Sequence, residues 1–192
     1  MLAQPQAISG LGGIGKTQLA IEYAYRHRDE YRAVLWVNAA SRDTIISSFL
    51  DLAVQLQLSE QEEQDQNRIV AAVKAWCATN ESWLLIFDNA DDLPLVEDFL
   101  PPDGNGHLLL TTHDQAPGSL AHVLAVETLD LEHGILLLLR RAKVLQPGQS
   151  LEQPSAADRT AAEAIVRAMD GLPLALEQVG AYIEEMQCSL AS

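Results

Sequence analysis

The residues best suited to chemistry lie near the start of the chain, in a glycine-rich segment from Gly10 to Thr17. Its sequence, G-L-G-G-I-G-K-T, matches the G-x-x-x-x-G-K-[ST] pattern of phosphate-binding loops. Glycines let the backbone approach a ligand closely, and the loop N–H groups then form a nest for anionic oxygens. We expect Lys16 to reach the β- and γ-phosphates of a nucleoside triphosphate and Thr17 to bind Mg²⁺. The predicted cofactor-binding residues here are Gly10, Leu11, Gly12, Gly13, Ile14, Gly15, Lys16, Thr17 and Gln18.

The sequence around the loop favours this interpretation over a flexible glycine segment that matches by chance. The apolar pair Ala7–Ile8 predicts a strand at about residues 6–9, and a helix is predicted from the loop to about His27. A helix that begins at the loop adds partial positive charge where phosphates would bind. The residues expected on its apolar face are Leu19, Ala20, Tyr23 and Ala24.

A carboxylate at the end of an apolar run supplies the second chemical signal. The run from Trp83 to Asp88 is apolar at nearly every position, which is typical of a parallel strand covered on both faces. Ligands of parallel sheets bind at the carboxyl ends of the strands. We therefore expect Asp88 beside Thr17, holding Mg²⁺ directly or through water. The alternative is an ordinary aspartate that begins a turn.

A third signal follows the next apolar run. Residues 107–112 predict another buried strand, and Thr111, Thr112 and His113 make its end polar. At this position they could contact a γ-phosphate. Simple polarity at a strand end is the alternative.

The elements between these signals indicate an α/β fold. Strands predicted at about 6–9, 32–38, 83–88, 107–112 and 122–126 are separated by helices or loops, which favours a parallel sheet with right-handed crossovers. Residues 101–106 and Pro117–Gly118 are rich in Pro, Gly, Asp or Asn, which predicts turns or loops there. Residues 59–66 are polar and acidic, which predicts a solvated loop. Cys77 is expected on the buried face of a helix.

The chain changes character near residue 127, so we predict an α/β domain over 1–127 and a small helical subdomain over 128–192. Ser41, Asp130 and Ser155 are suited to capping helix N-termini, and Pro173 to the first turn of the last helix. The residues expected to be buried on that helix are Leu174, Val179, Tyr182, Ile183 and Met186.

Composition excludes several classes of function. The 192 residues carry a net charge of −15, which argues against broad binding to nucleic acid or anionic membrane. No apolar run is long enough to span a bilayer. The two distant cysteines, Cys77 and Cys188, form no C-x-x-C unit, which favours a reduced, intracellular setting; a single disulfide between them is the alternative. We expect a cytoplasmic location.

Four segments in this order resemble the nucleotide-binding domain of NB-ARC proteins, the STAND-class, AAA+-related signalling ATPases. They are G-L-G-G-I-G-K-T at 10–17, L-L-I-F-D-N-A at 84–90, L-L-L-T-T at 108–112 and G-L-P-L-A-L at 171–176. The glycine loop by itself is a generic phosphate-binding pattern, whereas G-L-P-L-A-L at this distance from the loop makes the match specific. The sequences D-N-A-D-D and E-Q-V-G-A-Y-I are most similar to members that carry tetratricopeptide repeats.

The resemblance implies a five-stranded sheet of order 2-3-4-1-5 and an ATP/ADP-binding switch with Mg²⁺. Lys16, Thr17 and Asp88 match the phosphate and Mg²⁺ contacts, and Pro173 matches a proline that packs near adenine and ribose. The nucleotide is then expected in a cleft between the two domains, with a hinge near 127–130. Winged-helix and repeat domains outside this chain, and a homo-oligomer formed on activation, are also implied.

Two departures from the family pattern point to slow hydrolysis. Asn89 stands where many members have a second acid, and an amide can orient water but cannot take its proton. Asp91 or Asp92 could substitute, or could be turn residues. His113 replaces the arginine that usually senses the γ-phosphate. The candidate catalytic residues are therefore Lys16, Asp88, Asn89 and His113.

The leading alternative is a scaffold that keeps ADP as a structural cofactor without turnover, which Asn89 and His113 favour. A metabolic phosphotransferase would need an arginine-rich lid, and the chain has 12 Lys and Arg in total. A DNA-translocating motor conflicts with the acidic charge.

Overall fold

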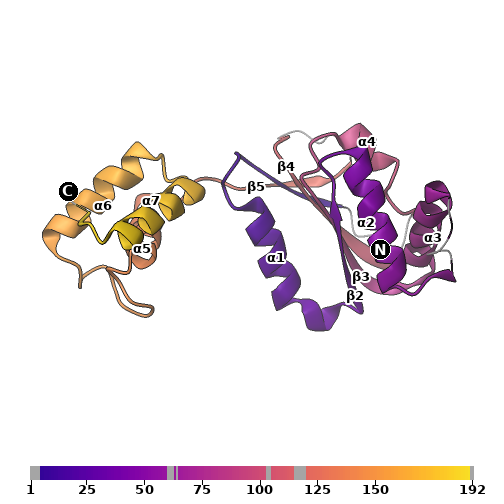
Figure 1. Ribbon diagram of the computed structural model, residues 1–192, viewed down its shortest axis with the longest axis horizontal. Helices are drawn as coiled ribbons and strands as arrows, with labels where there is room; N and C mark the ends of the chain where they lie inside the picture. The colour runs from indigo at the N-terminus through magenta and orange to yellow at the C-terminus, as the bar shows by residue number, and fades with distance from the viewer. Residues whose placement is uncertain (1–4, 60–62, 64, 103–104, 115–119, 191–192) are drawn as a thin grey trace. The chain divides into compact units, whose positions relative to one another are not determined.

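The computed structural model describes residues 5–59, 63, 65–102, 105–114 and 120–190, and these divide into two compact units (Figure 1). The first unit contains residues up to Gly10 and from Lys16 to Val126, and the second contains Leu11–Gly15 and the residues from Glu127 onward. Several predicted turn and loop positions lie outside the described residues: Asp103, Gly104, Pro117, Gly118, 60–62 and 64.

The first unit is built on a parallel sheet of five strands in the order β2-β3-β4-β1-β5, as predicted. All strand pairs are parallel, so the carboxyl ends of the strands meet at one edge of the sheet. β4 lies between β3 and β1. The strands are β1 Gln6–Ser9, β2 Ala33–Asn38, β3 Glu81–Asp88, β4 Asn105–Thr112 and β5 His122–Ala125.

Helices cover both faces of this sheet. Figure 1 shows α1 on one face and α2 and α3 on the other. The Ser41 hydroxyl caps α2 by accepting a hydrogen bond from Thr44 N, as its position predicted. A single turn, α4, was not predicted; Asp92 caps it by accepting from Leu95 N. The bounds are α1 Lys16–Arg26, α2 Arg42–Gln55, α3 Gln66–Thr79 and α4 Leu93–Glu97, with a 3-10 turn at Arg28–Glu30.

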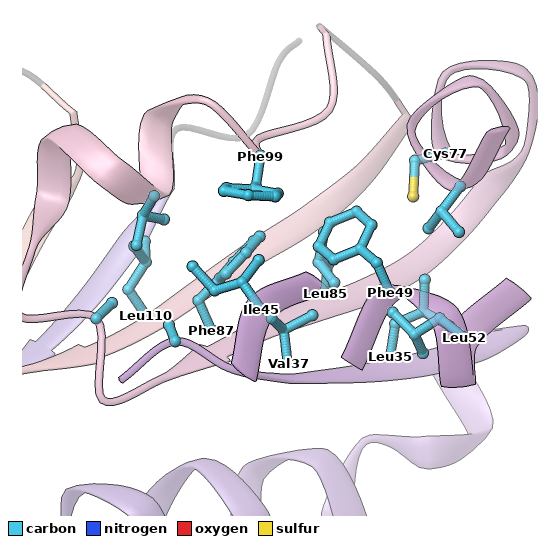
Figure 2. Close-up of a cluster of buried hydrophobic side chains, with 14 of the residues drawn as sticks. Leu35, Val37, Ile45, Phe49, Leu52, Cys77, Leu85, Phe87, Phe99 and Leu110 are labelled. Carbon is cyan, nitrogen blue, oxygen red and sulfur yellow. The ribbon is translucent and has the colours of Figure 1, made fainter. Parts of the chain in front are cut away.

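Strand β3 contributes to the hydrophobic clusters on both faces of the sheet, because its side chains alternate between those faces. Leu85 and Phe87 pack with Phe49 of α2 in the larger cluster (Figure 2). Leu84 and Ile86 pack instead with Ala20 of α1. Each such side chain contributes about 1.5–3 kcal/mol when it is fully buried. The two-sided burial of β3 confirms the interpretation of its continuous apolar sequence.

The apolar face predicted for α1 is only partly correct. Ala20 is buried and Ala24 packs partly against the sheet. Leu19 and Tyr23 are exposed. The alanines allow the helix backbone to lie close to the sheet, so the larger neighbouring side chains fall at the edge of the contact.

The second unit contains three helices around its own core, α5 Leu131–Arg141, α6 Ala156–Ala168 and α7 Pro173–Met186. Asp130 caps α5 and Ser155 caps α6, as predicted, each accepting a hydrogen bond from a first-turn N–H. Pro173 occupies the first turn of α7. The buried core residues are Leu138, Leu139, Ala142, Leu145, Ala162, Val166, Leu176, Ile183 and Leu190.

The prediction for the buried face of α7 was wrong in part. Leu174, Tyr182 and Met186 are exposed, Val179 is half-buried and Ile183 is buried. The buried stripe runs instead through Leu176, Gly180 and Ile183. At Gly180 the absence of a side chain allows α5 to approach, since a Cβ there would stand 2.7 Å from Arg141 Cβ.

Gly171 ends the turn that follows α6 and begins the connection to α7. Its φ of +65° lies in the left-handed region that favours glycine. Its N–H donates to Val166 O, and its carbonyl accepts from Leu129 N at 3.0 Å. This turn therefore joins the start of the second unit to the α6–α7 connection.

Within the described residues, no helix combines the length and hydropathy needed to cross a membrane.

Candidate functional site

The phosphate loop ends in Lys16, whose side chain is held against the loop itself. Gly13 and Gly15 take positive φ values of +75° and +100°, as a tight nest of N–H groups requires. Lys16 is 7% exposed, and its Nζ donates to Gly10 O at 2.9 Å. Burial lowers the pKa of Lys16, against the opposite effect of Asp91 and then Asp88. The ammonium is thus a partly desolvated cation with two carboxylates nearby.

Thr17 and Asp88 lie together, as their sequence context predicted. Thr17 Oγ1 donates a hydrogen bond of 2.8 Å to Asp88 Oδ1. The first belongs to the first turn of α1 and the second is the last residue of β3. Asp88 is 8% exposed, so its carboxylate is fixed at the carboxyl edge of the sheet.

Thr111 of β4 supports this carboxylate from the neighbouring strand. Its Oγ1 donates to Asp88 Oδ1 at 2.6 Å and accepts from Asn89 N at 3.0 Å. Thr111 is fully buried. One hydroxyl therefore orients Asp88 and fixes the backbone of Asn89 together.

Asn89 adopts a backbone conformation that is uncommon outside glycine. Its φ is +62°, in the left-handed region that asparagine tolerates better than most residues. The following residue, Ala90, donates its N–H to Thr111 O at 2.7 Å. The side chain of Asn89 is exposed at the same sheet edge as Asp88.

His113 and Asp91 form a pair beyond the ends of β4 and β3. Asp91 Oδ2 lies 2.9 Å from His113 Nδ1, and Asp91 Oδ1 accepts from His113 N at 2.7 Å and from Thr112 Oγ1 at 3.1 Å. Desolvation opposes ionisation, but these bonds and the imidazole charge lower the pKa of Asp91 overall. Of the two acids considered after Asn89, Asp92 is a helix cap and Asp91 belongs to the site.

Pro173 belongs to the second unit, together with the middle of the phosphate loop. Within this unit, Leu174 N donates to Gly13 O at 3.2 Å. A Cβ at Gly13 would stand 3.0 Å from Leu174 Cβ, so glycine leaves room for this contact.

A groove of about 680 Å³ lies elsewhere, between α1 and the sheet. It is largely apolar; Leu19, Tyr23, Leu84 and Leu124 are among its lining residues, and Thr17 and Asp88 are not. We therefore place the candidate site by its hydrogen bonds and not by the size of this groove.

Sequence reasoning missed two polar contacts of the site. Buried Ser9 Oγ donates to Asp114 O at 2.6 Å, which ties the end of β1 to the segment after β4. Asp91 was considered as an acid but not as the partner of His113. The signal available for both was adjacency, because each contact joins the carboxyl ends of two neighbouring parallel strands.

No family model matches the chain. A nucleotide-binding leucine-rich repeat (NLR)-like protein of Hyaloscypha variabilis is 28% identical over 98% of the chain and 20% of the relative. The regulatory protein AfsR of Streptomyces griseus is 26% identical over 88% of the chain and 17% of the relative. The chain thus spans about a fifth of the length of these relatives.

Solved structures show the same fold. A STAND protein with a tetratricopeptide repeat sensor from Pyrococcus horikoshii has a TM-score of 0.56 and 17% identity, covering 90% of this chain and 26% of that protein. The ORC2 protein of Aeropyrum pernix, determined in ADPNP–ADP complexes, has a TM-score of 0.60 and 16% identity. The match covers 97% of this chain and 58% of the ORC2 protein.

The sheet order and the phosphate-loop sequence agree with these neighbours, so the chain has the fold of P-loop ATPase domains. More particularly, the NLR-like relative and the STAND neighbour confirm the resemblance to the NB-ARC domain of STAND-class proteins. Tetratricopeptide repeats in the parent of this chain stay a prediction.

Proposed function

We propose that the chain is the ATP/ADP-binding switch module of a larger STAND-class protein, which requires Mg²⁺ and hydrolyses ATP slowly. The observation that carries the proposal is the 2.8 Å hydrogen bond between Thr17 Oγ1 and Asp88 Oδ1 at the end of the phosphate loop. A loop alone predicts phosphate binding. A buried carboxylate at the loop hydroxyl adds the oxygen chemistry that a Mg²⁺-bound nucleotide needs.

The residues present fit Mg²⁺. Hydroxyl and carboxylate oxygens are the hard ligands that this ion prefers. Thr17 Oγ1 and Asp88 Oδ1 would supply them, and Thr111 holds the carboxylate in place. When bound, Mg²⁺ would neutralise charge on the β- and γ-phosphate oxygens.

The remaining roles follow from the side chains. Lys16 binds the phosphates by charge, assisted by the loop N–H groups. Asn89 orients a water but cannot accept its proton, which keeps hydrolysis slow. Pro173 is proposed to contact the base, and the bond from Leu174 N to Gly13 O supports a place near the loop for this turn.

Calorimetric titration with ATP or ADP in the presence of Mg²⁺ tests the proposal. Wild type should bind both nucleotides, and Lys16→Ala should weaken binding at least about tenfold because a charge-assisted contact is lost. Lys74→Ala is the matched control, since Lys74 is a lysine of α3 that bonds Asp98 O away from the loop. If wild type binds neither nucleotide, or Lys16→Ala binds as well as wild type, the proposal is wrong.

The second candidate is a scaffold that retains ADP without turnover, and the amide of Asn89 favours it. A single-turnover measurement of phosphate release separates the two functions. Release above the background of Lys16→Ala supports slow hydrolysis, and release equal to background supports the scaffold. ADP recovered after heat denaturation of the purified protein would show the resting occupancy in either case.

As part of the same proposal, residues 1–127 bind the phosphates and residues 128–192 form the helical subdomain of the switch. ATP and ADP act by stabilising different states of the whole protein, and each can shift the balance only by its differential affinity. Flanking winged-helix and repeat domains, oligomerisation on activation and a cytoplasmic location complete the proposal. The greater length of the relatives supports the flanking domains.

A further inference from the structure

The phosphate loop is divided between the two compact units of the chain. Gly10 and Lys16, at its two ends, belong to the first unit, whereas Leu11–Gly15 belong to the second unit with α5, α6 and α7. The second unit therefore includes backbone that is expected to bind phosphates. A ligand that orders this backbone acts directly on a part of the second unit.

Leu174, in the first turn of α7, contacts the middle of the loop in two ways. Its backbone N–H donates to Gly13 O at 3.2 Å. Its side chain covers Gly13, because a Cβ placed on that glycine would stand 3.0 Å from Leu174 Cβ and 3.2 Å from Leu174 Cδ2. The first N–H groups of a helix have no carbonyl partner within it. The bond to Gly13 therefore satisfies a donor of Leu174 that α7 itself leaves over.

The peptide group between Gly13 and Ile14 is held at both of its polar atoms. Its carbonyl accepts from Leu174 N, and its N–H donates to Leu11 O at 3.4 Å. The Ile14 side chain is 5% exposed, so it anchors the same peptide. The glycines before and after Ile14 have the positive φ values with which loop N–H groups can converge on an anion. Leu174 thus contacts the part of the loop whose geometry matters most for phosphates.

The contact with Gly13 is separate from the core of the second unit. Leu174 is 52% exposed, whereas the buried core residues of the same helix are Leu176 and Ile183. Truncation of Leu174 should therefore leave the second unit folded. This makes the effect of the contact on the loop measurable by itself.

We propose that Leu174 is a positioning residue for the phosphate loop, and that it links phosphate binding to α7 without requiring the base of a nucleotide. The inference rests on the proposed nucleotide-binding function and names a further residue of that same site. It differs from the role proposed for Pro173, which is to contact the base. Coupling is reciprocal: a ligand that strengthens the Gly13–Leu174 contact is itself bound more tightly when the contact is present, by up to the same factor.

Inorganic triphosphate with Mg²⁺ is the probe, because it carries the phosphates of ATP and no base. Hydrogen exchange of the 192-residue chain, followed by mass spectrometry, reports on the first turn of α7. At about 100 times its Kd, triphosphate should slow exchange of residues 174–176 about tenfold, which is within the usual range of coupling between linked sites. Helix α3 of the first unit is the internal reference, and its exchange should not change.

Truncation of the Leu174 side chain tests the residue itself. Leu174→Ala should lose most of the protection and should weaken the binding of triphosphate and of ATP about tenfold each in calorimetry, because both ligands use the same loop. Leu174→Met keeps a long apolar side chain and should bind as wild type. Tyr182→Ala is the matched control, since it truncates another exposed apolar side chain of α7 and should also bind as wild type. Circular dichroism confirms that each variant is folded.

Three results would overturn the inference while ATP binding by wild type leaves the proposed function standing. The first is that triphosphate fails to bind or fails to slow exchange at the start of α7. The second is that Leu174→Ala weakens the binding of ATP but not of triphosphate, since Leu174 would then act through the base. The third is an equal loss in Leu174→Ala and Tyr182→Ala, which would indicate a general loosening of α7. If wild type binds neither ATP nor ADP, the proposed function itself has failed.

Discussion

Thr17 and Asp88 are separated by 71 residues in the chain, yet the hydroxyl of one donates a 2.8 Å hydrogen bond to the carboxylate of the other. The contact exists because β1 and β3 run parallel, with β4 between them. Both residues then emerge at the same edge of the sheet. Their pairing is a property of the sheet order and not of any local segment.

Asp88→Asn should reduce the benefit of Mg²⁺ for ATP binding. The amide is a weaker metal ligand than a carboxylate and carries no charge. The affinity for ATP in the presence of Mg²⁺ should therefore fall at least about tenfold, which is the smaller of the losses seen when a residue that supports a metal ligand is mutated. Calorimetry with Mg²⁺ and with EDTA measures the two affinities. Asp98→Asn, which alters an exposed ion pair with Arg42, should behave as wild type. An unchanged Mg²⁺ effect in Asp88→Asn would contradict the assignment.

Thr111→Val should destabilise the first unit by about 1–3 kcal/mol, the cost of leaving buried hydrogen-bonding groups unsatisfied. The change keeps the shape of the side chain but removes the donor to Asp88 and the acceptor for Asn89 N. Urea unfolding followed by circular dichroism measures the loss. Thr79→Val is the control, because Thr79 bonds backbone carbonyls at the exposed end of α3, and it should stay within about 0.5 kcal/mol.

Gly171→Ala should destabilise the second unit more than Gly148→Ala. Both positions have positive φ, so both substitutions cost about 1–2 kcal/mol in backbone strain. At Gly171 the added Cβ would also overlap the carbonyl oxygen of Leu129, whereas at Gly148 it would meet nothing within 4 Å. The overlap should add about 1–3 kcal/mol. Thermal unfolding of the two variants gives the comparison, and equal melting temperatures would show that the turn relaxes without cost.

Cys77 should resist thiol reagents in the folded protein. Burial raises the pKa of its thiol to about 12, so at pH 8 roughly one molecule in ten thousand carries the reactive thiolate. Reactivity rises with pH because deprotonation is then favoured. Cys188 is partly exposed and should be labelled first. Peptide mapping after iodoacetamide treatment at pH 8, with a urea-unfolded sample as reference, would contradict this if Cys77 is labelled in the folded protein.

Local chemistry was sufficient to predict most of the elements. Ser41, Asp130 and Ser155 cap helices with their own side chains. The phosphate-loop pattern is complete within eight consecutive residues, 10–17. The parallel sheet follows from the order of apolar runs, and its strand order came from the family resemblance. These features depend on residues that are close in sequence or on a pattern that many proteins share.

Features that depend on tertiary contacts were not predictable in this way. Helix α7 has apolar residues on two faces, so its periodicity could not distinguish the exposed Leu174 and Tyr182 from the buried Leu176 and Ile183. The pair of Asp91 and His113 spans 22 residues and joins two strand ends. A sequence pattern could indicate that both lie at one edge, but only the fold shows that they touch.

The sheet order also determines when each strand can pair with its neighbours during synthesis of the chain. β1 is made first, but its neighbours β4 and β5 lie about 100 residues later, which is about 5–20 s of ribosomal synthesis at typical rates. β2 and β3 can pair before then. Through that interval both edges of β1 are exposed to mispairing, a hazard for any unpaired strand. The newborn chain therefore carries the complete loop sequence for some time before β4 and β5, the two strands that pair with β1, have been translated.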